Sequence, residues 1–267
     1  MPSLVLLAAS LLLPASSQPS GTPSRRLDAP GVSRTNEPNI AVVRVADGKL
    51  LRQTGPAIAP TRPGSTIKPF TLYALLQQTG FDPAKRIACP GKLTIAGRRF
   101  DCSHGPAIPA VDASQAIAYS CNHYFAHWSR ILNEANLHAA LAHFHLTASH
   151  AHTPDELTLQ ALGEWGTEVT PVTLAQAYRL LALDENEPKL APLFAGLRLA
   201  TREGTAQLAG SGFAGKTGTA ATLSRLSLQA WFAGFTPATH PETVVVVYVP
   251  QGRGATSAAP LAREAIR

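Results

Sequence analysis

The sequence contains few charged residues, and its basic residues form no run. Only 15% of the 267 residues are charged, six are lysines, and the formal net charge is +6. The lysines and arginines are scattered, without the basic cluster or aromatic-interleaved basic stripe that is typical of nucleic-acid binding. We therefore expect no nucleic-acid partner. A mildly basic surface is still compatible with an anionic cell envelope.

The amino-terminal apolar run is too short to span a bilayer. It extends from Leu4 to about Pro14 and is followed by small residues, whereas a membrane-spanning helix needs about 20. We predict a signal peptide at 1–17, a Ser-, Pro-, Gly- and Arg-rich linker at 18–38, and export of the protein. No basic residue precedes Arg25, so an uncleaved segment that keeps the protein near the membrane remains an alternative.

Internal repeats are absent, and 45% of the residues are hydrophobic, which is enough for a buried core. Hydrophobic periodicity and turn residues predict strands at both ends of the chain and helices between them. The predicted strands are a hairpin at 40–51, two strands at 212–221 and 228–237, and a fully buried strand at 241–250. The predicted helices are 64–78, 112–119, 122–133, 136–145, 172–183 and 258–267, and residues 85–110 are expected to be loop-like. This order predicts one sheet built from distant segments, with a helical insertion.

Ser65 and Lys68 are the first candidate catalytic pair. Two residues three positions apart on a helix project from one face, so an amine can lie beside a hydroxyl. A serine needs a neighbouring base to become nucleophilic, and a lysine serves as that base when burial lowers its pKa. Because Ser-x-x-Lys also occurs by chance, the alternative is a capping serine with a solvated lysine.

Lys216, Thr217, Gly218 and Thr219 form a second motif in a predicted strand. Lysine offers a cation for a substrate carboxylate, the threonines offer hydroxyl groups, and glycine lets another backbone approach. Taken alone, the motif is also compatible with an exposed strand.

Ser120 and Asn122 provide the third element, in which a serine could relay a proton and an amide could bind a substrate carbonyl. By itself this pair resembles a helix cap. The three motifs occur in the order Ser-x-x-Lys, Ser-x-Asn, Lys-Thr-Gly. Their occurrence together in this order is not explained by chance, although each motif alone could be.

At this point the sequence resembles a known family. PGSTIKPFT, SCNHYFAHWSR, GEWGTEVTPVTLAQAYRLLA, AGKTGTA with WFAGFTP, and GATSAAPLAREAI are similar, in family order, to segments of penicillin-binding protein transpeptidase domains. The match runs from about residue 39 to the C-terminus, so we predict this domain at 39–267. The segment CPGKLTIAGRRFDCSHG, followed by SCN, looks most like class B members of the serine β-lactamase/D,D-peptidase superfamily.

The resemblance implies an α/β (α+β) transpeptidase fold, with a five-stranded antiparallel sheet flanked by helices and an all-α lobe. It implies that Ser65 attacks the D-Ala-D-Ala bond of a peptidoglycan stem peptide and that Lys68 takes the proton. Ser120 would then pass the proton to the departing D-alanine. Asn122 would bind the substrate amide, and the residues expected to hold its carboxylate lie at Lys216, Thr217, Gly218 and Thr219. β-Lactams should acylate the same serine.

Transpeptidase and carboxypeptidase activity remain open. The alternatives are a serine β-lactamase and a catalytically idle β-lactam-binding sensor or scaffold. No glycosyltransferase or pedestal module precedes residue 39, so we expect the chain to stand outside the standard elongation and division complexes.

Three cysteines fall in one region, and their state is open. In an exported protein, Cys89 and Cys102 could form a disulfide that leaves Cys121 beside the active site. The resemblance offers a zinc alternative, because some class B relatives hold zinc at these positions; here Cys89, Cys102, His104 and Cys121 would be the ligands. The short spacing from Cys102 to His104 argues against zinc. Free thiols are the third option, and no cofactor is firmly expected.

The remaining polar and aromatic candidates are expected to be structural. His143, His145, His150 and His152 form two His-x-His pairs without an obvious partner carboxylate, so we expect solvated side chains. The glycine-flanked setting of Glu164 resembles the transpeptidase turn, and we do not expect it to be a deacylating base. The aromatic residues predicted to lie in the core are Phe125, Trp128, Trp231 and Phe232.

Overall fold

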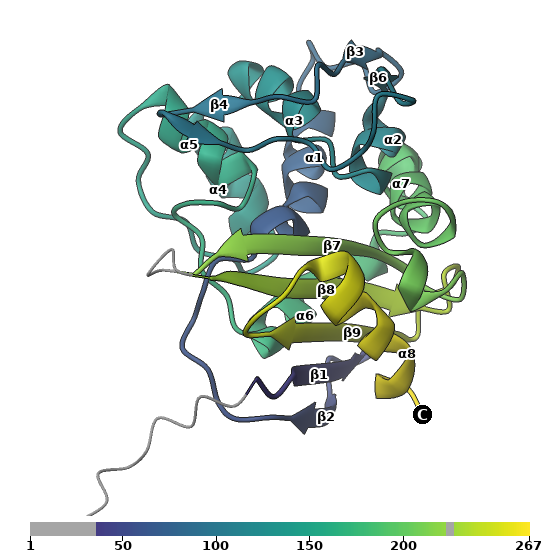
Figure 1. Cartoon of the computed structure of the whole chain (residues 1–267). Coiled ribbons are helices and arrows are strands. Elements are labelled where there is room, and N and C mark those ends of the chain that lie inside the picture. Colours follow the sequence, from purple (N-terminus) through teal and green to yellow (C-terminus); the bar gives the residue numbers. More distant parts are fainter. Residues whose placement is uncertain (1–35, 223–226) are drawn as a thin grey trace, which may run out of the picture. The chain divides into compact units, whose positions relative to one another are not determined.

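A five-stranded antiparallel sheet joins the two ends of the described chain (Figure 1). The structure is a computed structural model that describes residues 36–222 and 227–267. The strand order is β2-β1-β9-β8-β7. The strands are β1 (Asn39–Arg44), β2 (Leu50–Thr54), β7 (Ala214–Ala221), β8 (Leu228–Thr236) and β9 (Thr243–Val249). Because β7 is an edge strand, one of its sides is open to another element or to a ligand.

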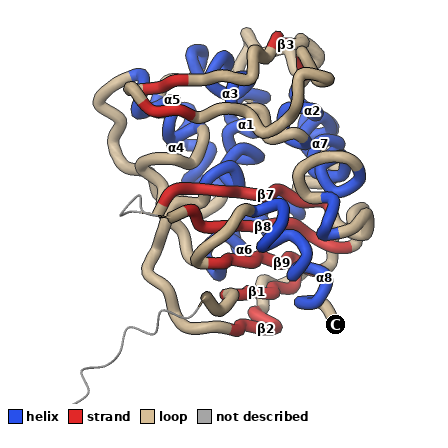
Figure 2. Tube along the Cα trace, viewed as in Figure 1, coloured by secondary structure: helices blue, strands red, loops and turns tan. Residues whose placement is uncertain are grey.

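The central strands are buried on both faces. In β9, Val244 and Val246 pack into one hydrophobic core, while Val245 and Val247 pack into a second core on the opposite face. Alternating side chains of a strand point to opposite faces, so an uninterrupted valine run suits a strand covered on both sides. The two covering helices are α6 (Pro171–Leu183) and α8 (Ala259–Ala265). Figure 2 shows them on opposite sides of the strands.

The remaining helices form a lobe next to β7 (Figure 1). A 3₁₀ turn, η1 (Gly64–Ile67), leads into α1 (Lys68–Leu76), which packs against other helices of the lobe. These are α2 (Ala113–Ala118), α3 (Asn122–Trp128), α4 (Glu134–His143), α5 (Pro154–Ala161) and α7 (Ala191–Arg202). The nucleophile segment therefore lies where the lobe meets the sheet, since η1 contacts β7.

Short elements connect these helices and strands. Four two-residue strands cross the segment predicted to be loop-like: β3 (Ile87–Ala88), β4 (Thr94–Ile95), β5 (Arg98–Arg99) and β6 (Ala110–Val111). The remaining single turns are η2 (Ser129–Ile131), η3 (Pro188–Leu190), η4 (Gln207–Ala209) and the π-helical η5 (Gly254–Ala258).

The predicted fold class is confirmed, with the five-stranded antiparallel sheet and the helical lobe both present. The helix expected at 122–133 ends at Trp128 and continues as η2, and α5 and α7 were not predicted. The aromatic residues expected in the core are buried there. The predicted signal peptide and most of the predicted linker lie outside the described residues. In the described ranges, no helix has the length and apolar character needed to cross a membrane.

Candidate active site

Ser65 and Lys68 occupy consecutive helical turns. The Lys68 backbone N–H donates to the Ser65 carbonyl across the 3₁₀ turn. Residues three apart in a 3₁₀ helix eclipse one another, so both side chains leave on the same side. Pro69 lies in the first turn of α1, where its missing N–H costs no helical hydrogen bond. Ser65 is half-buried and lines a cleft, whereas Lys68 is completely buried.

Among the described residues, the hydrogen-bond acceptors of the Lys68 amine are all neutral oxygen atoms. Its Nζ lies 2.5 Å from Asn122 Oδ1, 2.9 Å from the Ser120 carbonyl oxygen and 3.3 Å from Ser120 Oγ. Burial lowers the pKa of Lys68 to about 8, because desolvation penalises the ammonium form more than nearby anionic groups favour it. The amine is therefore suited to accept a proton near neutral pH. In the described part of the chain, Ser65 Oγ has no hydrogen-bond partner.

Ser120 occupies a backbone position that usually belongs to glycine. The Ser120 N–H donates to the Ile117 carbonyl and the Cys121 N–H to the Ala116 carbonyl, which is the Schellman pattern that ends a helix. Ser120 adopts φ +56°, where a side chain costs about 1–2 kcal/mol. A serine retained in this strained position is a candidate for a functional role.

Close backbone contacts place β7, which carries the Lys-Thr-Gly motif, against η1, the turn that carries Ser65. A Cβ atom at Gly218 would lie 2.5 Å from the Pro63 carbonyl oxygen and 3.0 Å from Thr66 Cγ2. A side chain at this position would separate β7 from η1. Gly218 is thus where the sequence analysis expected a close backbone approach, and the approaching backbone belongs to the nucleophile segment.

The hydroxyl groups of Thr217 and Thr219 line the cleft from β7. Thr217 Oγ1 lies 2.6 Å from Thr205 Oγ1, and the Thr205 N–H donates to Ala118 at the end of α2. Thr219 Oγ1 accepts the Gly254 N–H at 3.0 Å. The strand, the helix end and η5 are therefore linked around the same opening.

Two predicted substrate-binding side chains, those of Asn122 and Lys216, form hydrogen bonds with other groups of the protein. Asn122 Nδ2 donates to the Phe100 carbonyl at 2.8 Å, while its oxygen accepts from Lys68. Lys216 is completely buried and donates to the Thr217 carbonyl at 2.8 Å. Burial, followed by repulsion from Lys68, lowers the pKa of Lys216 well below its ordinary value. Their predicted contacts with substrate remain predictions.

A cleft of about 370 Å³ brings most of these groups together. It is lined by five predicted residues: Ser65, Ser120, Asn122, Thr217 and Thr219. Lys68, Lys216 and Gly218 lie behind this surface. Arg98, Arg253 and Thr205 also line the cleft and were not predicted. Glu164, which was expected to form a turn and not to act as a deacylating base, lines the cleft as well. The two arginines follow no motif, so only the folded chain reveals their position.

The three cysteines and His104 lie together directly behind the Ser120–Asn122 turn. Their ligand atoms are all within 4.8 Å of one another, and Cys121 is the residue between Ser120 and Asn122. The Sγ atoms of Cys89 and Cys102 are 3.5 Å apart, so the disulfide considered above is not formed. The short Cys102–His104 spacing, which argued against zinc, does not prevent this convergence.

This donor set fits a zinc ion. Bonds of about 2.3 Å in a tetrahedron place sulfur atoms about 3.8 Å apart, and the observed separations are 3.5 Å and 3.8 Å. Both ring nitrogens of His104 are buried, and neither has a hydrogen-bond partner in the part of the chain that the structure describes. The Tyr124 N–H donates to Cys121 Sγ at 3.4 Å. Such an N–H group stabilises a thiolate, the form that binds zinc.

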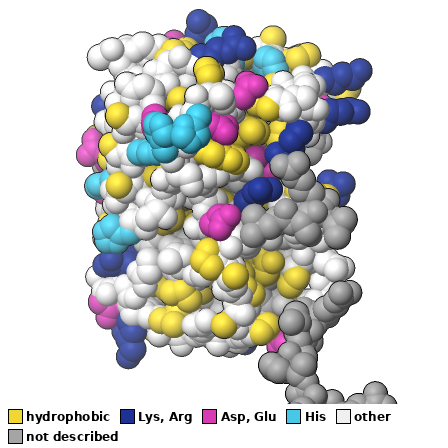
Figure 3. Space-filling model, turned by 90° about the vertical axis from the view of Figure 1, so that its left-hand side faces the viewer, with side chains coloured by type: hydrophobic (Ala, Val, Ile, Leu, Met, Phe, Trp, Pro, Cys, Tyr) yellow, Lys and Arg dark blue, Asp and Glu magenta, His cyan; other side chains and the backbone are white. Residues whose placement is uncertain are grey.

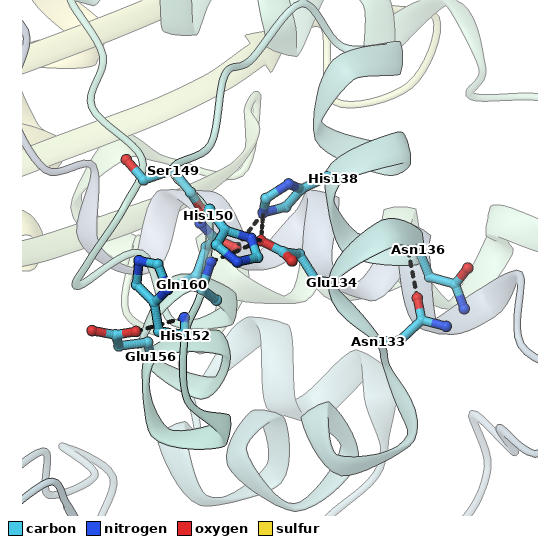
Figure 4. A network of polar contacts seen from close by, with 10 residues as sticks. Asn133, Glu134, Asn136, His138, Ser149, His150, His152, Glu156 and Gln160 are labelled. Atoms are coloured by element: carbon cyan, nitrogen blue, oxygen red, sulfur yellow. Dashed lines mark hydrogen bonds and ion pairs between the residues drawn. The ribbon is translucent and has the colours of Figure 1, made fainter.

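The prediction that His143, His145, His150 and His152 are solvated is confirmed, because all four side chains are exposed. Histidine side chains gather on one face of the molecule (Figure 3), and a carboxylate accompanies them. Glu134 Oε1 lies 2.8 Å from His150 Nδ1 and 3.6 Å from His138 Nε2 (Figure 4). His143 Nε2 lies 3.9 Å from Asp184 Oδ2. The partners come from other turns of the fold, which His-x-His spacing cannot show.

The strain at Ser120 generates a prediction that compares two variants. Ser120→Gly and Ser120→Ala both remove the hydroxyl, but only glycine relieves the positive φ. We expect the glycine variant to have a free energy of unfolding about 0.5–1 kcal/mol above that of the alanine variant, after allowance for glycine's greater unfolded-state entropy. Urea unfolding measures this difference. Equal stability of the two variants would contradict the assigned strain.

The sequence matches the family described as "Penicillin binding protein transpeptidase domain" over residues 15–195 and 193–267. No curated protein matches it. Pseudomonas aeruginosa PBP2 in complex with WCK 5153 has 20% identity and a TM-score of 0.74, with 86% of this chain and 70% of that chain covered. The transpeptidase domain of Burkholderia pseudomallei penicillin-binding protein 3 has 19% identity and a TM-score of 0.75, with 86% of both chains covered.

A complex of Helicobacter pylori PBP2 with MreC gives 16% identity and a TM-score of 0.74, with 86% of this chain and 59% of that chain covered. These likenesses show the shared fold, and the family match extends over nearly the whole sequence. The chain therefore belongs to the penicillin-binding protein transpeptidase domain family.

Proposed function

We propose that this protein is a serine D,D-acyltransferase, a transpeptidase or carboxypeptidase, that acts on peptidoglycan stem peptides through an acyl-Ser65 intermediate. The observation that carries the proposal is the buried Lys68 amine. It contacts Ser120 and Asn122 and shares a helical turn with a serine that faces the cleft. Family membership supports the same chemistry.

In the proposed acylation step, Ser65 Oγ attacks the carbonyl carbon of the D-Ala-D-Ala bond. Lys68 accepts the hydroxyl proton, and Ser120 passes it to the nitrogen of the departing D-alanine. The N–H groups of Ser65 and Thr219 would stabilise the oxyanion. Asn122 would orient the substrate amide, and Lys216 with the threonines of β7 would attract its carboxylate.

The proposed setting is the cell envelope. An exported protein would meet peptidoglycan stem peptides and β-lactams there, and an uncleaved amino-terminal segment would keep it near the membrane. In the second half-reaction, the acyl group would go to an amine, which gives a cross-link, or to water, which gives hydrolysis.

Labelling with fluorescent penicillin tests the proposal. Wild-type protein should become covalently labelled, whereas Ser65→Ala should not, because the attacking oxygen is lost. Denaturing gel fluorescence measures the label, and circular dichroism checks that the variant is folded. Folded wild-type protein without label would contradict acylation.

Steady turnover of a chromogenic cephalosporin would instead indicate a β-lactamase. An idle scaffold would release no D-alanine from a pentapeptide.

The pKa of Lys68 predicts the pH dependence of acylation. Only the neutral amine can accept the Ser65 proton, and the pKa of Lys68 is lowered to about 8. The rate constant for penicillin acylation should therefore rise roughly tenfold per pH unit below 8 and level off above it. Stopped-flow quenching of intrinsic fluorescence measures this rate constant. A flat profile between pH 6 and 9 would contradict the role of Lys68 as base.

We also propose that Cys89, Cys102, His104 and Cys121 hold a structural zinc ion. Four protein ligands leave no open coordination position, and zinc would fix the 89–104 segment against the Ser120–Asn122 turn. Metal analysis of purified protein should give about one zinc per chain, and Cys102→Ser should lower both zinc content and melting temperature. Ser103→Ala, at the neighbouring position, is the control. Zinc-free wild-type protein with an unchanged melting temperature would contradict the proposal.

A further inference from the structure

Glu164 places a second ionisable group in the same cleft. Its side chain lines the opening shared with Ser65, Ser120 and Asn122. Among residues 36–222 and 227–267, its carboxyl group forms neither a hydrogen bond nor an ion pair. Burying a carboxyl group without a partner costs free energy. A group retained at that cost beside a nucleophile is a candidate for contact with substrate.

The backbone fixes Glu164 near the nucleophile. The Gly64 N–H donates to the Gly163 carbonyl at 3.0 Å. A Cβ atom at Gly163 would lie 2.1 Å from the Gly64 carbonyl oxygen, so these backbones touch. Ser65 directly follows Gly64 in the chain, and Glu164 directly follows Gly163.

The end of α5 holds the turn in this position. Gly163, at φ +76°, and Glu164 donate their N–H groups to Gln160 and Leu159, which again is the Schellman pattern. Gln160 is completely buried; its side chain pairs with His138 Nε2 at 2.8 Å and donates to the Ser149 carbonyl at 3.0 Å. Figure 4 shows this network, which continues from His138 to Glu134. The turn that carries Glu164 is therefore fixed by the backbone hydrogen bonds that end α5, next to this side-chain network.

The charged groups that face Glu164 come from three elements. They are Arg98 on β5, Lys68 on α1, and Arg62 in the segment before η1. Burial raises the pKa of Glu164 to about 7, although these cations oppose the rise. Near neutral pH, the carboxylate can accept a proton and the carboxylic acid can return it.

We propose that Glu164 is the proton acceptor of the second half-reaction, which transfers the acyl group from Ser65 to water or to an acceptor amine. This inference rests on the proposed acyl-serine chemistry, and it reverses the expectation that Glu164 forms a turn and is not a deacylating base. It adds a catalytic group to the three sequence motifs.

The proposed step is balanced in atoms and protons. The oxygen of water, or the nitrogen of a neutral amine, forms a bond to the acyl carbon while Glu164 takes its proton. The tetrahedral adduct then collapses and the bond from the acyl carbon to Ser65 Oγ breaks. The proton held by Glu164 returns to Ser65 Oγ, which regenerates the hydroxyl and the carboxylate. Lys68 remains neutral throughout this half-reaction.

Glu164→Gln separates the two half-reactions. With a thioester analogue of a D-Ala-D-Ala substrate, thiol release follows acylation, and intact-mass spectrometry follows the acyl-enzyme. The variant should acylate within about twofold of wild type, release about one equivalent of thiol and then stall. Its deacylation should slow by about 10²-fold or more, the range for loss of a general base. Glu168→Gln, a carboxyl removal four residues along the same segment, should behave as wild type.

A pH series and a second variant exclude a purely structural effect. The rate constant of wild-type deacylation should rise with pH and reach a plateau above about 7. This rise should be absent in Glu164→Gln. Glu164→Asp, which keeps a shorter carboxylate, should recover part of the rate. Unchanged deacylation in a folded Gln variant would overturn the inference, as would an equal loss of both half-reactions. Wild-type protein that never acylates would instead overturn the proposed function.

Discussion

Burial of the Lys68 amine constrains the rest of the site. An ammonium group removed from water without a carboxylate is expensive, and the three oxygen atoms around this amine are carbonyl, amide and hydroxyl oxygens. That environment favours the neutral base. It also requires α1 to carry the lysine into the core while the Ser120–Asn122 turn meets it from another helix. The close packing of η1 against β7 and against Gly163 keeps the nucleophile at the same place.

The cysteine cluster lies behind this arrangement and is connected to it through the backbone. Cys121 separates the two residues that contact Lys68, and the Phe100 carbonyl that holds Asn122 lies two residues before Cys102. A metal ion bound by these thiols would restrain the position of the Lys68 acceptors without taking part in the chemistry. In a small domain, one ion can replace many packing contacts that would otherwise order an irregular segment. The segment from 87 to 111 has only two-residue strands to order it.

The sheet could be predicted because its strands have a local signature. The valine run of β9 and the hairpin turn near Gly48 each indicate their structure within about ten residues. The three candidate catalytic motifs were found for the same reason. Arg98 and Glu164 could not be assigned to the cleft, because their position depends on contacts between distant segments. His150 likewise lies in a loop and meets Glu134 of α4 across 16 residues. Helix α7 lacks a capping side chain, so the proline in its first turn is a weak start signal by itself.

Two helix ends explain how the cleft acquires its polar groups. Both α2 and α5 finish in the same hydrogen-bond pattern, and each presents a side chain at its end, Ser120 in one case and Glu164 in the other. The first residue touches the Lys68 amine, while the second approaches Ser65 through the Gly163–Gly64 contact. Because the two groups are held by different helices, the environment of Glu164 can change without moving Lys68. Under the proposed chemistry, this arrangement would allow the fate of the acyl group to vary independently of its formation.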